Sequence, residues 1–344
     1  MKTPIRRRRL VLTALVVQCV VLGGIGLVAL DLFAHKRVES VAGLNMWGYR
    51  GEVAAQKQPR EIRIAVIGGT RAFGLGLAAT WTTTTVLRQY VRLATDRPGY
   101  ELRPVVALNL ARVSALPDSY LSTITHYAYL KPDYLCIYDD LGVGGEPSFE
   151  KTSGIYAATG YMPMLPLVLR EKAMAWKFGD VVAGYRAERS LIEGRWFKRS
   201  AGVALDVSGR ALGAFDRTFA RVVANQRVDW SGAVSPNLYA ATLMNAVGYA
   251  AEHARGVVLV VSPAETARQS ANLAALMPLI YARLPQHPSV RFISLNDIPT
   301  LRDPALRLDE WNFGGDATEV VAKRIAPAMI ELINANAPEI PSRQ

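Results

Sequence analysis

The N-terminal part of the chain contains an apolar run that is long enough to cross a lipid bilayer. Residues 10–30, LVLTALVVQCVVLGGIGLVAL, carry no charge. As a helix rising about 1.5 Å per residue, they would span roughly 30 Å of hydrocarbon. We therefore expect a transmembrane anchor over residues 10–32, which makes the membrane a partner. The alternative is a cleaved signal peptide, but its apolar core is normally shorter and ends at a small-residue cleavage site, and no such site follows Leu30.

The basic residues of the chain are concentrated in front of this run. Arg6–Arg9 directly precede it, and Lys and Arg accumulate on the cytoplasmic side of membrane spans. Residues 1–9 are therefore predicted to be a cytoplasmic tail, with the remaining chain on the opposite side. Without Lys2 and Arg6–Arg9, the net charge of +11 falls to +6. The excess is thus partly a topology signal, and we expect no nucleic-acid partner.

Cysteine and histidine are scarce. The chain has two cysteines and four histidines, which excludes a disulfide framework and a cysteine zinc site. The histidines form no HExxH or His-x-His pattern, so a histidine-rich metal centre is not expected. We predict neither a metal nor another cofactor.

Strand and helix patterns alternate after a polar segment at 33–60, which we interpret as a stalk. The strands are expected at 60–70, 103–111, 133–140, 256–263 and 290–297, and the helices at 82–97, 117–130, 211–226, 236–254, 264–284 and 316–334. This alternation predicts an α/β domain over 61–335, with a parallel sheet of about five strands in the order 2-1-3-4-5 and helices on both faces. The less regular stretch at about 141–200 is predicted to be an insert, and 336–344 a tail.

Four segments that are separated in the sequence should meet at one edge of this sheet. Ligand sites in such folds lie at the carboxyl ends of the strands. That edge collects residues 68–70, 109–111 and 139–142, and the loop 309–316 lies before the last helix.

These segments resemble the sequence blocks of the SGNH/GDSL hydrolases, particularly their bacterial, envelope-associated, membrane-anchored members. The matching stretches are IAVIGGTRAFGLG (64–76), VVALNLARVS (105–114), LKPDYLCIYDDLGV (130–143) and DEWNFGGDATEVVAKRIAPAMIELI (309–333), after the lead-in GLNMWGYRG (43–51). The resemblance implies a flavodoxin-like SGNH-hydrolase fold and a setting in the bacterial envelope. The large domain would then lie in the periplasm, attached to the inner membrane by a single span.

The residues at the family's catalytic positions differ in this chain. The resemblance places the nucleophilic serine at Thr70, the oxyanion-binding glycine at Ala111, the oxyanion-binding asparagine at Gly142 and the base histidine at Asn312. The carboxylate that orients the histidine is retained as Asp309. An amide cannot accept the hydroxyl proton at neutral pH, and help from a general base contributes about 10²–10⁴ in rate. We therefore expect a degenerate site without hydrolase activity.

Several functions remain possible for this rim, the edge of the sheet where residues 68–70, 109–111, 139–142 and 309–316 meet. The chain is predicted to bind a partner or an envelope glycan, or to act as a scaffold for a membrane protein. The alternative is an ester hydrolase or acyl-transfer enzyme that uses Thr70 with a substitute base such as Asp139 or Asp140. We expect Arg71 to pair with Asp140 or Asp139 across the former oxyanion pocket, although Arg71 facing solvent would bind an anion instead. Trp311 is a candidate for stacking on a sugar or for packing as a lid residue.

Overall fold

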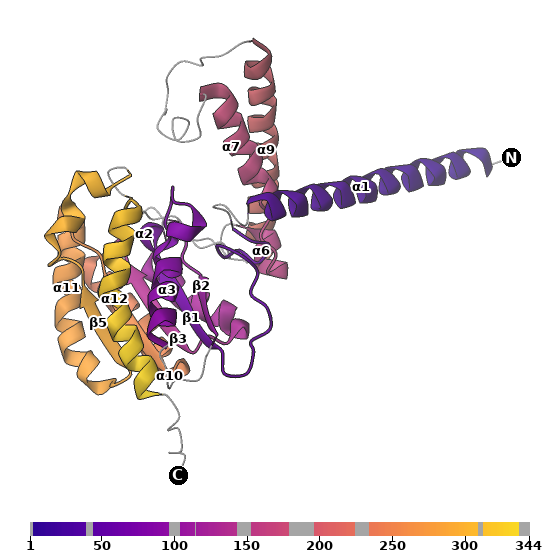
Figure 1. Ribbon diagram of the computed structural model, residues 1–344. Coiled ribbons are helices and arrows are strands. Elements are labelled where there is room, and N and C mark those ends of the chain that lie inside the picture. Colours follow the sequence, from indigo (N-terminus) through magenta and orange to yellow (C-terminus); the bar gives the residue numbers. More distant parts are fainter. Residues whose placement is uncertain are drawn as a thin grey trace.

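The computed structural model describes residues 3–38, 44–95, 104–113, 115–142, 153–178, 196–223, 234–308 and 312–336. Its centre is a sheet of five parallel strands in the order β2-β1-β3-β4-β5 (Figure 1). The strands are β1 (Ile62–Gly68), β2 (Val105–Asn109), β3 (Tyr134–Asp139), β4 (Gly256–Val261) and β5 (Val290–Ser294). The predicted α/β class and strand order are confirmed.

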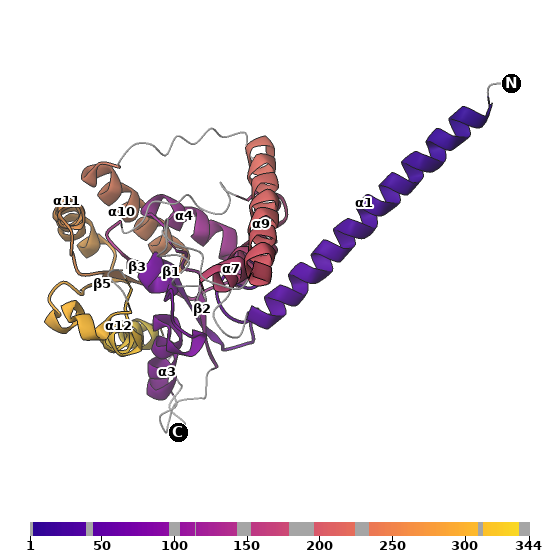
Figure 2. The same ribbon diagram turned by 90° about the horizontal axis from the view of Figure 1, so that it is seen from above.

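Helices cover both faces of the sheet, which is why the three central strands are buried along their whole length. One face packs against α3 (Thr83–Thr95) and α12 (Gly315–Ala335). The other packs against α4 (Pro117–His126), α10 (Pro236–His253) and α11 (Ala267–Arg283). Figure 2 shows the two layers on opposite sides of the strands. The short elements are α2 (Thr70–Phe73), η1 (Ala79–Trp81), η2 (Tyr127–Leu130), η3 (Leu284–Gln286), η4 (Pro299–Arg302) and η5 (Pro304–Leu306).

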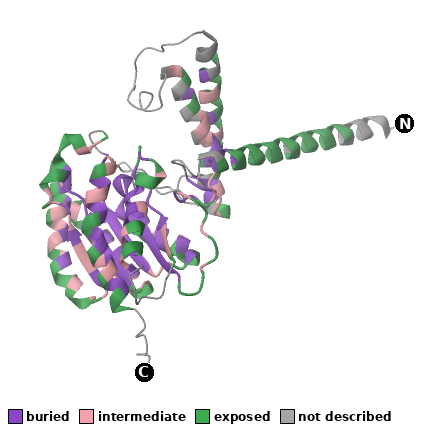
Figure 3. Cartoon of the chain, viewed as in Figure 1, coloured by how far each residue is buried: buried purple, intermediate pink, exposed green. Residues whose placement is uncertain are grey.

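The first helix, α1 (Thr3–Val38), projects away from the domain (Figures 1 and 2). Its described side chains are almost all exposed, and Figure 3 shows most of the helix coloured as exposed. Within the described chain it is the one helix that is long and apolar enough to cross a membrane, over Val11–Lys36.

The C-terminal end of α1 is fixed to the domain by two buried polar side chains. The Asp31 carboxylate accepts hydrogen bonds from the backbone N–H of Met164, at 2.9 Å, and from the Tyr161 hydroxyl. The His35 ring lies 2.7 Å from the Met162 carbonyl through Nε2. These contacts attach α1 to the segment that leads into α7 (Leu165–Phe178).

The expected stalk at 33–60 is partly folded onto the domain. Helix α1 continues to Val38, and both Tyr49 and Arg50 are buried. Arg50 bridges to Asn109 at the end of β2, and its guanidinium donates to the carbonyl groups of Phe73 and Gly74, each at 2.5 Å. A buried guanidinium needs several hydrogen-bond acceptors, and the domain supplies them for Arg50. The segment around Arg50 is therefore held against the domain and is not a free stalk.

The region between β3 and α10 is more helical than the sequence indicates. It contains α6 (Gly154–Thr159), α7 and α9 (Trp196–Val223), and α7 and α9 pack side by side. The helix expected at 211–226 therefore begins at residue 196. Glycines such as Gly202 interrupt the helical pattern of apolar residues in the sequence. A Cβ at Gly202 would lie 3.2 Å from the Lys177 side chain and 3.6 Å from the Ala173 carbonyl, so this glycine allows the two helices to approach closely.

Candidate functional site

The first block of the site is the sharp turn from β1 into α2. Gly69 is the N-cap residue, and Thr70, the predicted nucleophile position, is the buried first residue of the helix. A Cβ on Gly69 would lie only 2.4 Å from Oδ2 of Asp140. Glycine is therefore required for Asp140 to reach the beginning of α2.

Asp140 follows β3 and extends across to this turn. Its Oδ2 accepts the backbone N–H of Arg71 at 3.0 Å, and the residue is 1% exposed. Burial raises the pKa of Asp140 to about 7, although the charge of Arg71 and the N–H groups of Arg71 and Thr70 lower it. The carboxyl group thus occupies backbone donors at the start of α2.

The Arg71 side chain forms its ion pair with Glu265, and the expected pair with Asp140 or Asp139 is wrong. Arg71 Nη2 lies 2.6 Å from Glu265 Oε2, and the guanidinium lies 4.4 Å from the centre of the Phe313 ring. Arg307 binds the other oxygen of Glu265 at 2.6 Å. Arg71 therefore contacts Asp140 through its backbone N–H and the loop after β4 through its guanidinium.

Asp139 belongs to a different environment from its neighbour. Successive residues of a strand point to opposite faces, and Asp139 lies fully buried on the face that carries α4 and α10. Tyr120 donates to its Oδ1 at 2.9 Å and Tyr239 to its Oδ2 at 2.6 Å. Burial raises the pKa of Asp139, although these hydrogen bonds lower it. Asp139 therefore ties two helices to the end of β3.

The second and third blocks bring Ala111 and Gly142 to the same end of the sheet. The Ala111 N–H, an oxyanion donor by resemblance, donates to Oδ1 of Asn109 at 3.2 Å. Gly142 has φ of +85°, and a Cβ there would lie 3.0 Å from Nδ2 of Asn272. Neither position directs a free side-chain donor toward Thr70.

The fourth block contacts the first block where Phe313 packs against Arg71. The predicted candidates Asp309 and Trp311 lie outside the described residues. Asn312, at the base position, is buried, and its backbone carbonyl accepts the Leu308 N–H at 2.9 Å. The ring of its neighbour Phe313 lies against the Arg71 guanidinium, so the residues just before α12 contact the start of α2.

The histidines lie away from this rim. His126 and His253 are the last residues of α4 and α10, which run back from the carboxyl ends of the strands. His287 precedes β5. His253 and His287 therefore lie at the opposite edge of the sheet, whereas the His126 ring packs against Tyr156, with ring centres 4.9 Å apart, and His35 lies on α1.

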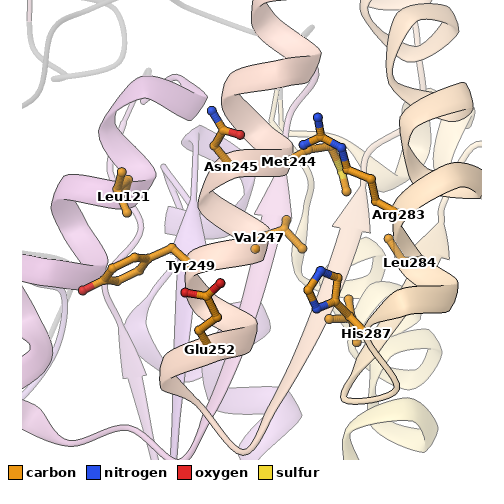
Figure 4. A pocket seen from close by; sticks show the side chains of 11 residues that line it. Leu121, Met244, Asn245, Val247, Tyr249, Glu252, Arg283, Leu284 and His287 are labelled. Carbon is orange, nitrogen blue, oxygen red and sulfur yellow. The ribbon is translucent and has the colours of Figure 1, made fainter.

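A surface pocket of about 380 Å³ lies at that opposite edge (Figure 4). It is lined by α10, the end of α11 and the first residue of β5, with Glu252, Arg283 and His287 around it. It shares no residue with the four blocks. Within the described chain no group of three His, Cys, Asp or Glu side chains is placed to hold a metal ion.

The sheet order and the rim define an α/β protein with four blocks gathered at the switch point of a parallel sheet. No family model and no curated protein matches the sequence. Among solved structures, the chain is similar to a protein assigned to the G-D-S-L lipolytic family from Desulfitobacterium hafniense DCB-2. The identity is 11% and the TM-score 0.39, covering 78% of this chain and 99% of the neighbour.

Two esterases are also similar in structure. One is a family two carbohydrate esterase from Clostridium thermocellum, 9% identical with a TM-score of 0.40, covering 83% of this chain and 67% of the neighbour. The other is a two-domain esterase active on acetylated mannans, 10% identical with a TM-score of 0.40, covering 83% and 53%.

Proposed function

We propose that this chain is a membrane-anchored, SGNH-hydrolase-like protein that binds a partner instead of hydrolysing esters. The observation that carries the proposal is the position of Asp140. Its carboxyl oxygen accepts the backbone N–H of Arg71, next to Thr70. An acyl-transfer reaction on Thr70 would need nearby N–H groups for the negative oxygen of its tetrahedral intermediate.

A carboxylate at these donors opposes that chemistry in two ways. It uses an N–H group at the start of α2, and above its pKa of about 7 its negative charge would also repel an oxyanion. Loss of one oxyanion donor alone costs about 2.7–4 kcal/mol of transition-state stabilisation. The Ala111 N–H is also engaged, by Asn109, so two backbone donors among the described residues are already occupied by side-chain oxygens of the chain.

The proposed role is that of a binding or scaffold component on the periplasmic face of the bacterial inner membrane. The Arg6–Arg9 cluster before the apolar helix supports this orientation. An envelope glycan or a membrane-protein partner fits this setting. Pull-down from membranes, compared with binding to isolated envelope glycans, distinguishes the two.

Labelling of the full chain in detergent with a serine-reactive phosphonate tests the loss of activity. We expect no labelling, with a known serine hydrolase in the same sample as the positive control. Labelling that disappears in Thr70→Ala would contradict the proposal.

A second candidate is a hydrolase in which Asp140 acts as the base for Thr70. The observation that favours it is the pKa of Asp140, which burial raises to about 7, because a general base works best near the ambient pH. In that case Asp140→Asn abolishes turnover and the rate follows a titration near pH 7. The proposed binding role predicts no turnover in either protein.

A further inference from the structure

Helix α9 exposes an apolar face that nothing in the described chain covers. Val203, Val207, Phe215 and Phe219 are 45%, 60%, 68% and 38% exposed. They are spaced by multiples of four residues, and small residues such as Ala211 and Ala214 continue the surface between them. Residues spaced in this way share one side of a helix.

The opposite side of α9 is occupied by the domain. Gly202, Gly209 and Asp216 are buried at intervals of seven residues. Gly202 lies against α7, and Asp216 accepts the backbone N–H of Ile155 in α6 at 2.9 Å. The apolar face therefore points outward because α7 and α6 hold the other side of the helix.

The charges on α9 are distributed unequally around this face. Arg210 and Arg217 are exposed along one flank of it. Asp206 pairs with Lys177 and with Arg210, each at 2.9 Å, and Asp216 is buried. Among the described side chains of α9, no acidic residue is exposed. An apolar face flanked by arginines is typical of helices that lie in a lipid interface.

The position of α9 relative to α1 identifies the surface that it meets. In Figures 1 and 2, α9 lies on the side of the domain from which α1 projects, and it runs across the direction of α1. Asp31 at the end of α1 is bonded to the residues that begin α7, and α7 packs along α9. A bilayer crossed by α1 would therefore pass beside α9.

We propose that α9 lies in the headgroup region of the bilayer that α1 spans, with Val203, Val207, Phe215 and Phe219 in the lipid and Arg210 and Arg217 at anionic headgroups. This inference rests on the proposed membrane anchor. The apolar side chains of α1 over Val11–Lys36 would be covered by lipid. The apolar face of α9 would be covered by the same lipid, at the point where the chain leaves the bilayer. The α7–α9 pair would then hold the domain in a fixed orientation on the membrane.

The test uses the full chain in vesicles of phosphatidylethanolamine and phosphatidylglycerol, in a Cys19→Ser background that leaves only the buried Cys136. Single cysteines at Val207→Cys and Phe215→Cys carry an environment-sensitive fluorophore. Leu22→Cys in α1 reports on the anchor. Leu238→Cys on α10, which is 59% exposed, serves as the solvent control. Each label is quenched by brominated lipid and, separately, by aqueous iodide.

We expect the labels at 207 and 215 to be quenched by brominated lipid and protected severalfold from iodide relative to the label at 238. If the label at 22 is in lipid while those at 207 and 215 stay open to iodide, the interfacial helix is excluded but the anchor stands. If the label at 22 is also open to iodide, the anchor itself is wrong. Protection at 207 and 215 without lipid quenching would indicate a protein partner or a second copy, and would also overturn the proposal.

Discussion

The carboxyl group of Asp140 lies against the backbone of Arg71, with Oδ2 3.0 Å from the nitrogen, while the guanidinium of the same arginine pairs with Glu265. One residue of the first block thus connects the loops after β3 and β4, and Phe313 of the fourth block covers it. These contacts join three segments at the carboxyl end of the sheet.

Replacing Asp140 by asparagine should change how stability depends on pH. An ordinary aspartate in the unfolded chain has a pKa of about 3.9, and burial raises the pKa of Asp140 in the folded protein to about 7. Between these values the folded state binds a proton that the unfolded state does not, so the wild type loses stability as pH rises, by up to about 4 kcal/mol over the interval.

Asp140→Asn has no such titration, and its amide oxygen can still accept the Arg71 N–H. Its melting temperature should therefore rise relative to the wild type from about pH 4 to pH 7 and then stay level. Asp297→Asn, which removes an exposed carboxylate, controls for the lost charge. Parallel pH profiles for wild type and Asp140→Asn would show that Asp140 is not buried as described.

The Arg71–Glu265 pair should contribute strongly to stability. The Arg71 side chain is 0% exposed and that of Glu265 is 14% exposed, so Glu265→Gln removes the negative charge that this buried guanidinium contacts at 2.6 Å. We expect a loss of about 3–5 kcal/mol in the free energy of unfolding. The double variant with Arg71→Met should lose less than the sum of the two single variants. Glu331→Gln, which disrupts the exposed pair with Arg291, should have little effect. Additive losses from Arg71→Met and Glu265→Gln would show that the two side chains do not interact.

Gly142→Ala should destabilise the protein by about 1–3 kcal/mol, because φ of +85° is unfavourable for alanine and the new Cβ would press on Asn272. Gly248→Ala is a matched control. Gly248 lies within α10, where a Cβ would meet nothing within 4 Å, so this change should stabilise the helix by about 0.5–1 kcal/mol. Chemical denaturation measures both. Equal effects would mean that the turn after β3 is not constrained.

The sequence predicts the five strands and their order because buried parallel strands are continuous apolar runs with glycine turns between them. It also indicates that 68–70, 109–111 and 139–142 meet at one edge. It does not reveal the partner of Arg71. Glu265 follows β4 at the same edge, and the switch-point rule could have included it. Because strand side chains alternate between the two faces, the sequence could also have assigned Asp139 and Asp140 to different faces. The tyrosine partners of Asp139 could not be predicted, because they come from distant helices whose rotation no local pattern specifies.

Restoring the family residues should not be sufficient while Asp140 is present. The triple variant Thr70→Ser, Gly142→Asn, Asn312→His supplies a nucleophile, a donor and a base, yet the carboxyl group still occupies the Arg71 N–H. We expect phosphonate labelling only when Asp140→Gly is added, provided that circular dichroism shows both proteins folded. Equal labelling of the triple and quadruple variants would show that Asp140 does not obstruct the site.

Turnover of short acyl esters by the purified full chain, compared with Thr70→Ala, decides whether Thr70 acts as a nucleophile. We expect both proteins to hydrolyse the ester at the same background rate at every pH from about 5 to 9, on either side of the Asp140 titration near 7. Hydrolysis by the wild type that is lost in Thr70→Ala would contradict this expectation and would establish Thr70 as a nucleophile.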